Sequence, residues 1–207
     1  MPINKKNRPF VIGLTGSIGM GKSQTAKLFA AEGIPVFDAD AVIHELYAGE
    51  AAAMIEAAYP GTTKNGVVDR AALSKSLAGD PGALARLEGL MHPLVAERRE
   101  QFLAAADAPI VLLDIPLLLE TGAKVDAVVV ASAPEHVQRE RVLARPGMGE
   151  AKFEALKARQ MNDAQKRSQA HYVVMTYKGL DHAREQVKMI LADVRTRRVR
   201  ASESGKN

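Results

Sequence analysis

A glycine-rich string near the N-terminus carries the clearest indication of chemistry. It reads Gly16-Ser17-Ile18-Gly19-Met20-Gly21-Lys22-Ser23 and matches the pattern G-x-x-x-x-G-K-[ST] of phosphate-binding loops. Glycines allow the backbone to turn so tightly that successive N–H groups face one phosphate chain. Lys22 is then expected to neutralise the β and γ phosphates of ATP, and the Ser23 hydroxyl to be an oxygen ligand of Mg²⁺. Gln24, the next residue, is expected to join the nucleotide-binding set.

The surroundings of this string favour a nucleotide site over a glycine-rich turn that fits the pattern by chance. The apolar run at residues 10–14 predicts a strand before it, and a helical pattern at residues 22–32 follows it. The positive end of that helix would face the same anion as the loop. Strand, loop and helix in this order predict binding of ATP.

Carboxylates follow two other predicted strands. Asp114 ends the apolar run at residues 110–114, where a partner to the magnesium shell is expected, although many strands end in aspartate. Asp38 and Asp40 follow the run at residues 34–37 and would emerge beside the loop, because the carboxyl ends of parallel strands meet at one sheet edge. One of them could accept a hydroxyl proton. The structural alternatives are helix capping for Asp38 and helix-dipole stabilisation for Asp40.

Five short apolar runs separated by longer helical segments predict an α/β fold. The runs are continuous rather than alternating, as parallel strands covered on both faces require, and lie at residues 10–14, 34–37, 110–114, 127–131 and 172–175. Helical patterns occupy residues 22–32, 40–47, 69–77, 81–106, 134–144, 149–160 and 181–198. We therefore expect a five-stranded parallel sheet flanked by helices.

The chain is expected to form a single domain over residues 9–200. Residues 41–107, between the second and third strands, are mainly helical and too long for one crossover, which predicts a helical insertion that could hold a second substrate. Residues 145–170 contain the breaker Pro146-Gly147 and many Arg, Lys and Gln residues, which predicts a mobile helical lid. Residues 1–8 and 201–207 are polar and predict flexible tails.

Composition narrows the classes of function. The 207 residues contain no cysteine, which excludes disulfides and thiolate chemistry. No apolar run approaches the roughly 20 residues that span a bilayer, so a soluble, cytoplasmic protein without a membrane partner is expected. The net charge of +4 suits an anionic ligand, while an aromatic content of 4% offers few stacking platforms and argues against a nucleic-acid partner.

The combined pattern resembles the dephospho-coenzyme A kinase family. Four blocks carry the resemblance: Ile12-Gly13-Leu14-Thr15 with the glycine-rich string, Val36-Phe37-Asp38-Ala39-Asp40, His92-Pro93, and Leu113-Asp114-Ile115-Pro116-Leu117-Leu118-Leu119-Glu120. Their order and intervals match over about residues 10–191. The resemblance implies a P-loop kinase-like core with a helical substrate-binding insertion and a lid. It also implies a magnesium- and ATP-dependent phosphotransferase that phosphorylates the ribose 3′-hydroxyl of dephospho-coenzyme A, giving coenzyme A and ADP, the last step of coenzyme A biosynthesis.

The resemblance also implies roles for individual residues. Asp40 falls where the family places its proposed catalytic base, and Asp38 is then a supporting carboxylate. His92 and Pro116 are assigned to the acceptor side, and Arg145 matches a lid arginine that reaches the ATP phosphates. Without the resemblance, a helix break with a surface histidine at His92-Pro93 and a solvated Arg145 would be the simpler interpretations.

Three positions depart from the family pattern. Ser17 stands where a second glycine is usual and needs a backbone conformation that tolerates a Cβ atom. Residues 175–179, Met-Thr-Tyr-Lys-Gly, lack the asparagine that many relatives carry near the adenine, so backbone groups are expected to contact the base. The lid sequence at residues 146–149 lacks the acidic residue that often follows its arginine.

Other classes of protein fit part of the pattern. Another P-loop kinase acting on a nucleoside or nucleotide would use the same loop and a similar carboxylate. A nucleotide-dependent switch is less favoured because the guanine-selective sequence Asn-Lys-x-Asp is missing. The basic C-terminal residues motivate a nucleic-acid-binding NTPase, but truncation after Leu191 is expected to leave kinase activity largely intact. A monomer or weak homo-oligomer is expected.

Overall fold

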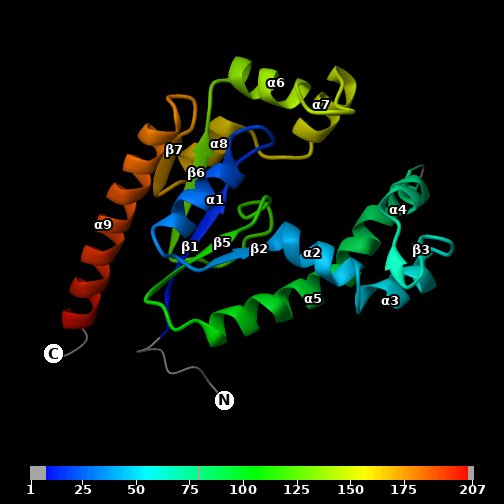
Figure 1. The fold of residues 1–207 in the computed structure, drawn as a ribbon, viewed down its shortest axis with the longest axis horizontal. Coiled ribbons are helices and arrows are strands. Elements are labelled where there is room, and N and C mark those ends of the chain that lie inside the picture. The colour runs from blue at the N-terminus through cyan, green and yellow to red at the C-terminus, as the bar shows by residue number, and fades with distance from the viewer. Residues whose placement is uncertain (1–7, 79, 205–207) are drawn as a thin grey trace. The chain divides into compact units, whose positions relative to one another are not determined.

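The computed structural model describes residues 8–78 and 80–204, with side chains described up to residue 198 (Figure 1). The chain divides into two compact units. The first contains the described residues up to Phe37 and from Ala106 onward, and the second is Asp38–Ala105. The second unit coincides closely with the predicted helical insertion at residues 41–107.

The five-stranded sheet has the order β2-β5-β1-β6-β7. Its strands are β1 (Phe10–Thr15), β2 (Val36–Asp38), β5 (Ile110–Asp114), β6 (Ala127–Ser132) and β7 (Tyr172–Met175). The pairs β1–β5, β1–β6 and β6–β7 are parallel, with Ile12 opposite both Leu112 and Ala127. All five predicted strands are present, and the prediction of a parallel α/β sheet is confirmed.

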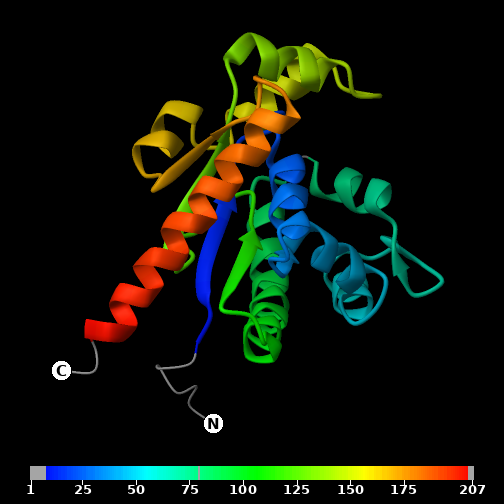
Figure 2. The same cartoon turned by 60° about the vertical axis from the view of Figure 1, so that its left-hand side comes forward.

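Alternate side chains of the central strands face two different layers. Ile12, Leu14 and Val129 are fully buried in a cluster with residues of α1 (Lys22–Ala31) and α9 (Leu180–Ser204). Figure 2 shows α1 and α9 lying side by side. Val128 and Val130 pack with Leu118 in a separate cluster, as expected when successive side chains of a strand point to opposite faces. This sheet is therefore covered on both faces, which explains its continuous apolar runs.

Three helices connect β6 to β7. They are α6 (Glu135–Leu143), α7 (Glu150–Lys157) and α8 (Asp163–Ser168). The last begins with a capping box, in which Asn162 and Gln165 each accept a hydrogen bond from the main-chain N–H of the other. The predicted lid at residues 145–170 contains α7 and α8, and α8 was not foreseen as a helix.

The second unit has a core of its own. Its elements are α2 (Ala39–Tyr47), α3 (Ala51–Ala58), β3 (Thr63–Lys64), β4 (Val67–Val68), α4 (Arg70–Leu77) and α5 (Ala83–Ala105). Leu46, Ile55, Leu73 and Met91 are buried together in this core. Helix α5 continues through Pro93, so the alternative of a helix break at His92-Pro93 is wrong.

Several predicted boundaries differ from the structure for local reasons. The second strand begins at Val36 rather than residue 34, because the Ile34 N–H donates to the Phe29 carbonyl and completes the end of α1. Helix α9 ends at Ser204, inside the predicted tail. Arg8, also assigned to a tail, donates to both Asp126 oxygens at 2.6 and 2.8 Å. Residues 1–7 and 205–207 lie outside the described residues. Within the described ranges, no helix is long and apolar enough to cross a membrane.

Candidate phosphoryl-transfer site

The phosphate loop turns at two glycines with left-handed backbone conformations. Gly19 has φ of 79° and Gly21 has φ of 89°. A Cβ atom on Gly21 would lie 2.8–2.9 Å from side-chain atoms of Thr176, and one on Gly19 would lie 2.5 Å from Val142 Cγ2. Both positions therefore need glycine for its backbone freedom and for its lack of a side chain. Ser17 has no positive φ, so its backbone conformation tolerates a Cβ atom at this position of the loop.

The loop leads directly into the N-terminus of α1. Gly21 occupies the capping position, and among the described residues no side chain caps the first turn. No acidic residue lies in that turn. The first N–H groups of an α-helix lack partners within the helix and carry its positive dipole end, so this terminus suits an anion.

Lys22 and Asp114 form an ion pair beside the loop. Lys22 Nζ donates to Asp114 Oδ1 at 2.7 Å, and the two side chains are only 12% and 3% exposed. Asp114 ends β5, the strand next to β1 in the sheet, so the parallel topology brings its carboxylate to the loop. The structure thus brings together two residues that the sequence predicted to share one site.

The donor set at this place fits Mg²⁺. Ser23 offers an exposed hydroxyl in the first turn of α1, and Asp114 offers a buried carboxylate. Mg²⁺ prefers oxygen and commonly binds through one or two protein ligands together with water and phosphate oxygens. Within the described ranges, no three His, Cys, Asp or Glu side chains cluster as a metal cage. The residues are suited to a metal that arrives with a nucleotide.

Arg141 connects the loop to the end of β7. Its guanidinium donates to Thr176 Oγ1 and to the Thr176 carbonyl, both at 2.9 Å. The Thr176 hydroxyl also lies 2.8 Å from the Met20 carbonyl, to which it can donate. Thr176 lies in the segment where the family resemblance led us to expect an asparagine, and here it braces the loop. Sequence reasoning missed Arg141, which lies one helical turn before the predicted lid arginine.

Polar groups of α6 and of the predicted lid segment hold the other side of the loop. Ile18 N–H donates to Gln160 Oε1 at 2.9 Å, and Gln138 Nε2 donates to the Ile18 carbonyl at 2.7 Å. The Ser17 hydroxyl donates to the Met161 carbonyl at 3.1 Å. The Ile18 N–H, one of the predicted phosphate donors, therefore already has a partner. These contacts join residues more than 100 positions apart in the sequence, so no local sequence pattern predicts them.

An ion pair between the buried Lys166 and the partly exposed Glu120 anchors the segment that carries Gln160. Lys166 is fully buried, and its Nζ lies 2.7 and 3.0 Å from the two Glu120 oxygens. Burial raises the pKa of Glu120. The hydrogen bonds from Lys166 and from the Met161 N–H together lower this pKa by more than burial raises it, so the net shift is downward. Glu120 ends the Leu113–Glu120 block of the family resemblance. The structure gives this glutamate a partner that sequence analysis had not found.

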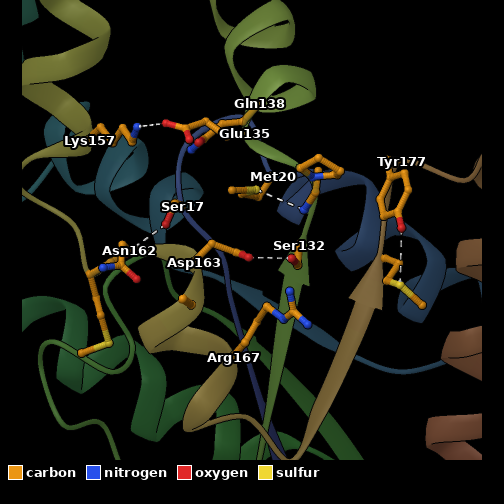
Figure 3. A pocket seen from close by; sticks show the side chains of 15 residues that line it. Ser17, Met20, Ser132, Glu135, Gln138, Lys157, Asn162, Asp163, Arg167 and Tyr177 are labelled. Carbon is orange, nitrogen blue, oxygen red and sulfur yellow. Dashed lines mark hydrogen bonds and ion pairs between the residues drawn. The ribbon is translucent and has the colours of Figure 1, made fainter.

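A cavity of about 710 Å³ lies behind the loop (Figure 3). Its lining includes Ser17 and Met20 from the loop, the ends of β6 and β7, the start of α6, and α8. Ser132 Oγ donates to Asp163 Oδ2 at 2.8 Å, while among the described residues Asp163 Oδ1 has no partner. Tyr177 lines the cavity beside Met175, so the cavity adjoins the segment predicted to lie near the adenine.

The remaining predicted residues lie apart from the loop contacts. Arg145 is exposed after α6, and its side chain makes no hydrogen bond or ion pair with another described residue. Pro116 is half-buried, and its carbonyl accepts from Thr15 Oγ1 at 2.8 Å. His92 is exposed on α5 of the second unit.

Asp38 and Asp40 begin the second unit. The Asp38 side chain accepts from the Ala41 N–H at 3.0 Å, so it caps α2 as the structural alternative stated. Asp40 is exposed in the first turn of the same helix. Its carboxylate makes no hydrogen bond or ion pair with another described residue, while Asp38 fixes the start of the helix.

Comparison with known proteins decides the family. The family model described as dephospho-CoA kinase matches residues 10–182. The chain is 57% identical over 189 residues to the dephospho-CoA kinase of Bradyrhizobium diazoefficiens, a match covering 89% of this chain and 95% of that protein. The chain belongs to the dephospho-CoA kinase family. This confirms the predicted family and enzyme class over the alternatives of a nucleoside kinase and a switch.

Solved structures agree with the fold of a dephospho-CoA kinase family member. The structure of TT1252 from Thermus thermophilus has a TM-score of 0.80 and 33% identity, covering 90% of this chain and 98% of that one. Dephospho-CoA kinase from Campylobacter jejuni has a TM-score of 0.63 and 20% identity, covering 89% and 96%. The second likeness supports the P-loop kinase-like fold alone.

Proposed function

We propose that this protein transfers the γ-phosphoryl group of ATP to the 3′-hydroxyl of the ribose of dephospho-coenzyme A. The products are coenzyme A and ADP. The observation that carries the proposal is the ion pair between Lys22 and Asp114 at the N-terminus of α1, within a chain that belongs to the dephospho-CoA kinase family. It supplies a cation and a carboxylate where phosphoryl transfer needs them.

The nucleotide phosphates lie in the loop and against the first turn of α1. Residues 16–24 form this site, with the N–H groups of the helix terminus and Lys22 compensating the phosphate charge. The phosphates and Asp114 compete for the Lys22 ammonium, which is 2.7 Å from the carboxylate in the structure. Bound Mg²⁺ would be held by Ser23 and Asp114 and would neutralise charge on the transferring group. The adenine lies near Thr176 and Tyr177, where main-chain groups contact it.

The second unit holds the acceptor. Asp40 accepts the proton of the ribose hydroxyl while the hydroxyl oxygen forms a bond to the γ-phosphorus of ATP. At the same time the bond between the γ-phosphorus and the bridging oxygen of ADP breaks. Asp38 keeps α2 in place through its capping hydrogen bond to Ala41. His92 and Pro116 contact the acceptor. These roles follow the family resemblance and agree with the exposed positions of Asp40 and His92.

The lid over residues 145–170 excludes water while the phosphoryl group moves. Arg145, exposed after α6, reaches the ATP phosphates when this segment covers the nucleotide. Excluding water makes transfer to the hydroxyl faster than hydrolysis. A cytoplasmic location and a monomeric or weakly oligomeric state stay predictions.

Acceptor profiling tests the proposed function. Initial rates of ADP formation from Mg·ATP are compared for dephospho-coenzyme A, adenosine, AMP, other nucleosides and no acceptor. We expect a large rate only with dephospho-coenzyme A, and slow hydrolysis without an acceptor. Equal rates with and without acceptors would contradict the proposal. A higher rate with a nucleoside than with dephospho-coenzyme A would indicate a nucleoside kinase instead.

A further inference from the structure

Both main-chain polar groups of one loop residue are held by glutamine side chains. Gln160 accepts from the Ile18 N–H at 2.9 Å, and Gln138 donates to the Ile18 carbonyl at 2.7 Å. A main-chain N–H can only donate and a carbonyl can only accept. The partners therefore fix which amide atom each glutamine presents: oxygen from Gln160 and nitrogen from Gln138.

These glutamines come from two elements that flank the start of the predicted lid. Gln138 lies on α6, before residue 145, and is 3% exposed. Gln160 follows α7, inside the 145–170 segment, and is half-buried. Beside Ile18, a Cβ atom on Gly19 would lie 2.9 Å from the Gln138 carbonyl, so α6 packs directly against the loop. The conformation of the loop is thus tied to the elements that carry the lid.

The backbone next to Gln160 is itself firmly held. The Met161 N–H donates to Glu120 Oε1 at 2.9 Å, and the Met161 carbonyl accepts from the Ser17 hydroxyl at 3.1 Å. Glu120 is bonded in turn by the fully buried Lys166. A side chain on so constrained a backbone has little freedom to leave the loop, which is the arrangement that preorganises a binding loop.

We propose that Gln138 and Gln160 are positioning residues that hold the phosphate loop in its nucleotide-binding shape through Ile18 and couple it to the lid segment. The inference rests on the proposed function, in which this loop binds the phosphates of ATP. Both glutamines act on the bound nucleotide through the main chain of Ile18. Since Gln160 occupies the Ile18 N–H, that group orients the loop and does not donate to phosphate.

The direction of the hydrogen bond at Gln160 provides a sharp test. The carboxylate that Gln160→Glu introduces can still accept from the Ile18 N–H, whereas Gln160→Leu offers no acceptor. Gln165→Glu is the control for the added negative charge. Gln165 lies on the same segment, is exposed, and its side chain also accepts a main-chain hydrogen bond, from the Asn162 N–H at 3.1 Å. The dissociation constant of Mg·ADP, measured by titration calorimetry at 25 °C, reports on the loop without any acceptor.

We expect Gln160→Leu to weaken Mg·ADP binding by about tenfold, since a half-buried N–H loses its partner. Gln160→Glu should bind Mg·ADP within about threefold of Gln165→Glu. Gln138→Leu should also weaken Mg·ADP binding by about tenfold. The double leucine variant should lose less affinity than the product of the two single losses, because both glutamines hold the same residue, Ile18. KM for dephospho-coenzyme A should change less than KM for ATP.

Two results would overturn the proposal. One is a lower melting temperature for Gln160→Leu with an unchanged Mg·ADP dissociation constant, which is the signature of a merely structural role. The other is equal loss of affinity in Gln160→Leu and Gln160→Glu. If Gln138→Leu does not fold, the variants of the half-buried Gln160 still test the proposal on their own. If the wild-type protein binds Mg·ADP but does not phosphorylate dephospho-coenzyme A, the proposed function fails while this test still applies.

Discussion

At the scale of single residues, Lys22 carries the largest share of the proposed nucleotide recognition. Replacing it by alanine removes the cation beside the phosphates, and we expect kcat/KM for ATP to fall by at least about 100-fold. Lys27→Ala is the matched control, because Lys27 is exposed on the same helix. Steady-state kinetics of both variants check this expectation. Equal values of kcat/KM for ATP in the two variants would show that Lys22 does not bind the phosphates.

Asp40 is expected to act on the acceptor and not on the nucleotide. Asp40→Asn should leave the dissociation constant of Mg·ADP unchanged and lower kcat by about 10²- to 10⁴-fold, the usual contribution of a general base. Asp38→Asn is the control, because asparagine can also cap a helix and should keep the bond to Ala41. Turnover as fast as that of the wild-type protein in Asp40→Asn would exclude Asp40 as the base.

Glu120 links stability to acid pH. Its pKa lies below the ordinary value of 4.5, so its stabilising contribution is complete above about pH 4.5 and is lost as pH falls through the lowered pKa. Glu120→Gln leaves the buried Lys166 without its charged partner and should reduce the free energy of unfolding at pH 7 by about 1–3 kcal/mol, since Glu120 itself is partly exposed to solvent. That difference should shrink near pH 3.

Urea unfolding at the two pH values measures the effect. Glu185→Gln breaks the exposed pair with Lys188 and should leave the free energy of unfolding nearly unchanged at either pH. A constant difference between wild-type protein and Glu120→Gln from pH 7 to pH 3 would contradict the assigned pKa direction.

At the scale of elements, the turn from the phosphate loop into α1 allows little variation. Gly21→Ala combines a left-handed backbone with a Cβ atom 2.8 Å from Thr176. Gly33→Ala has the same backbone strain, at φ of 79°, but no atom within 4 Å of the added Cβ. We expect Gly33→Ala to cost about 1 kcal/mol of stability with an unchanged KM for ATP. Gly21→Ala should also raise KM for ATP several-fold, and equal kinetics in both variants would be evidence against the tight packing of the loop.

The strands were predictable from the sequence, while some short elements were not. Continuous apolar runs located all five strands of the large sheet within two residues. Helix α3 (Ala51–Ala58) was missed because, among the described residues, no side chain caps its first turn, although Pro60-Gly61 just after it is a helix stop signal. The β3–β4 hairpin was also missed, although Asn65-Gly66 between its strands is a strong hairpin signal. Both residues have positive φ, as the tight turn requires.

At the scale of the whole molecule, the C-terminal helix belongs partly to the core. Val194 of α9 is fully buried with the central strands, so truncation after Leu191 would remove a core side chain. We expect that truncation to lower the free energy of unfolding by roughly 2 kcal/mol or more. Truncation after Arg198 should leave both stability and kinase activity near those of the full chain. Denaturant unfolding and activity assays compare the two. Equal stability would contradict the packing of Val194.

The site was only partly predictable because its support is assembled from distant parts of the chain. The glycine-rich motif predicted Lys22, and the end of the apolar run at residues 110–114 predicted Asp114. Lys166 belongs to a segment rich in Lys, Arg and Gln that resembles a solvated surface, yet it is fully buried. Gln138 and Gln160 contact the loop across more than 100 residues, and only the fold brings them there.

The position of the transferred phosphate tests the central claim most directly. Purified protein is incubated with Mg·ATP and dephospho-coenzyme A, and the product is analysed by mass spectrometry and phosphorus NMR. We predict ADP and a new phosphomonoester on the ribose 3′-hydroxyl in equal amounts. ADP with free inorganic phosphate, or a phosphate on a different hydroxyl, would contradict the claim.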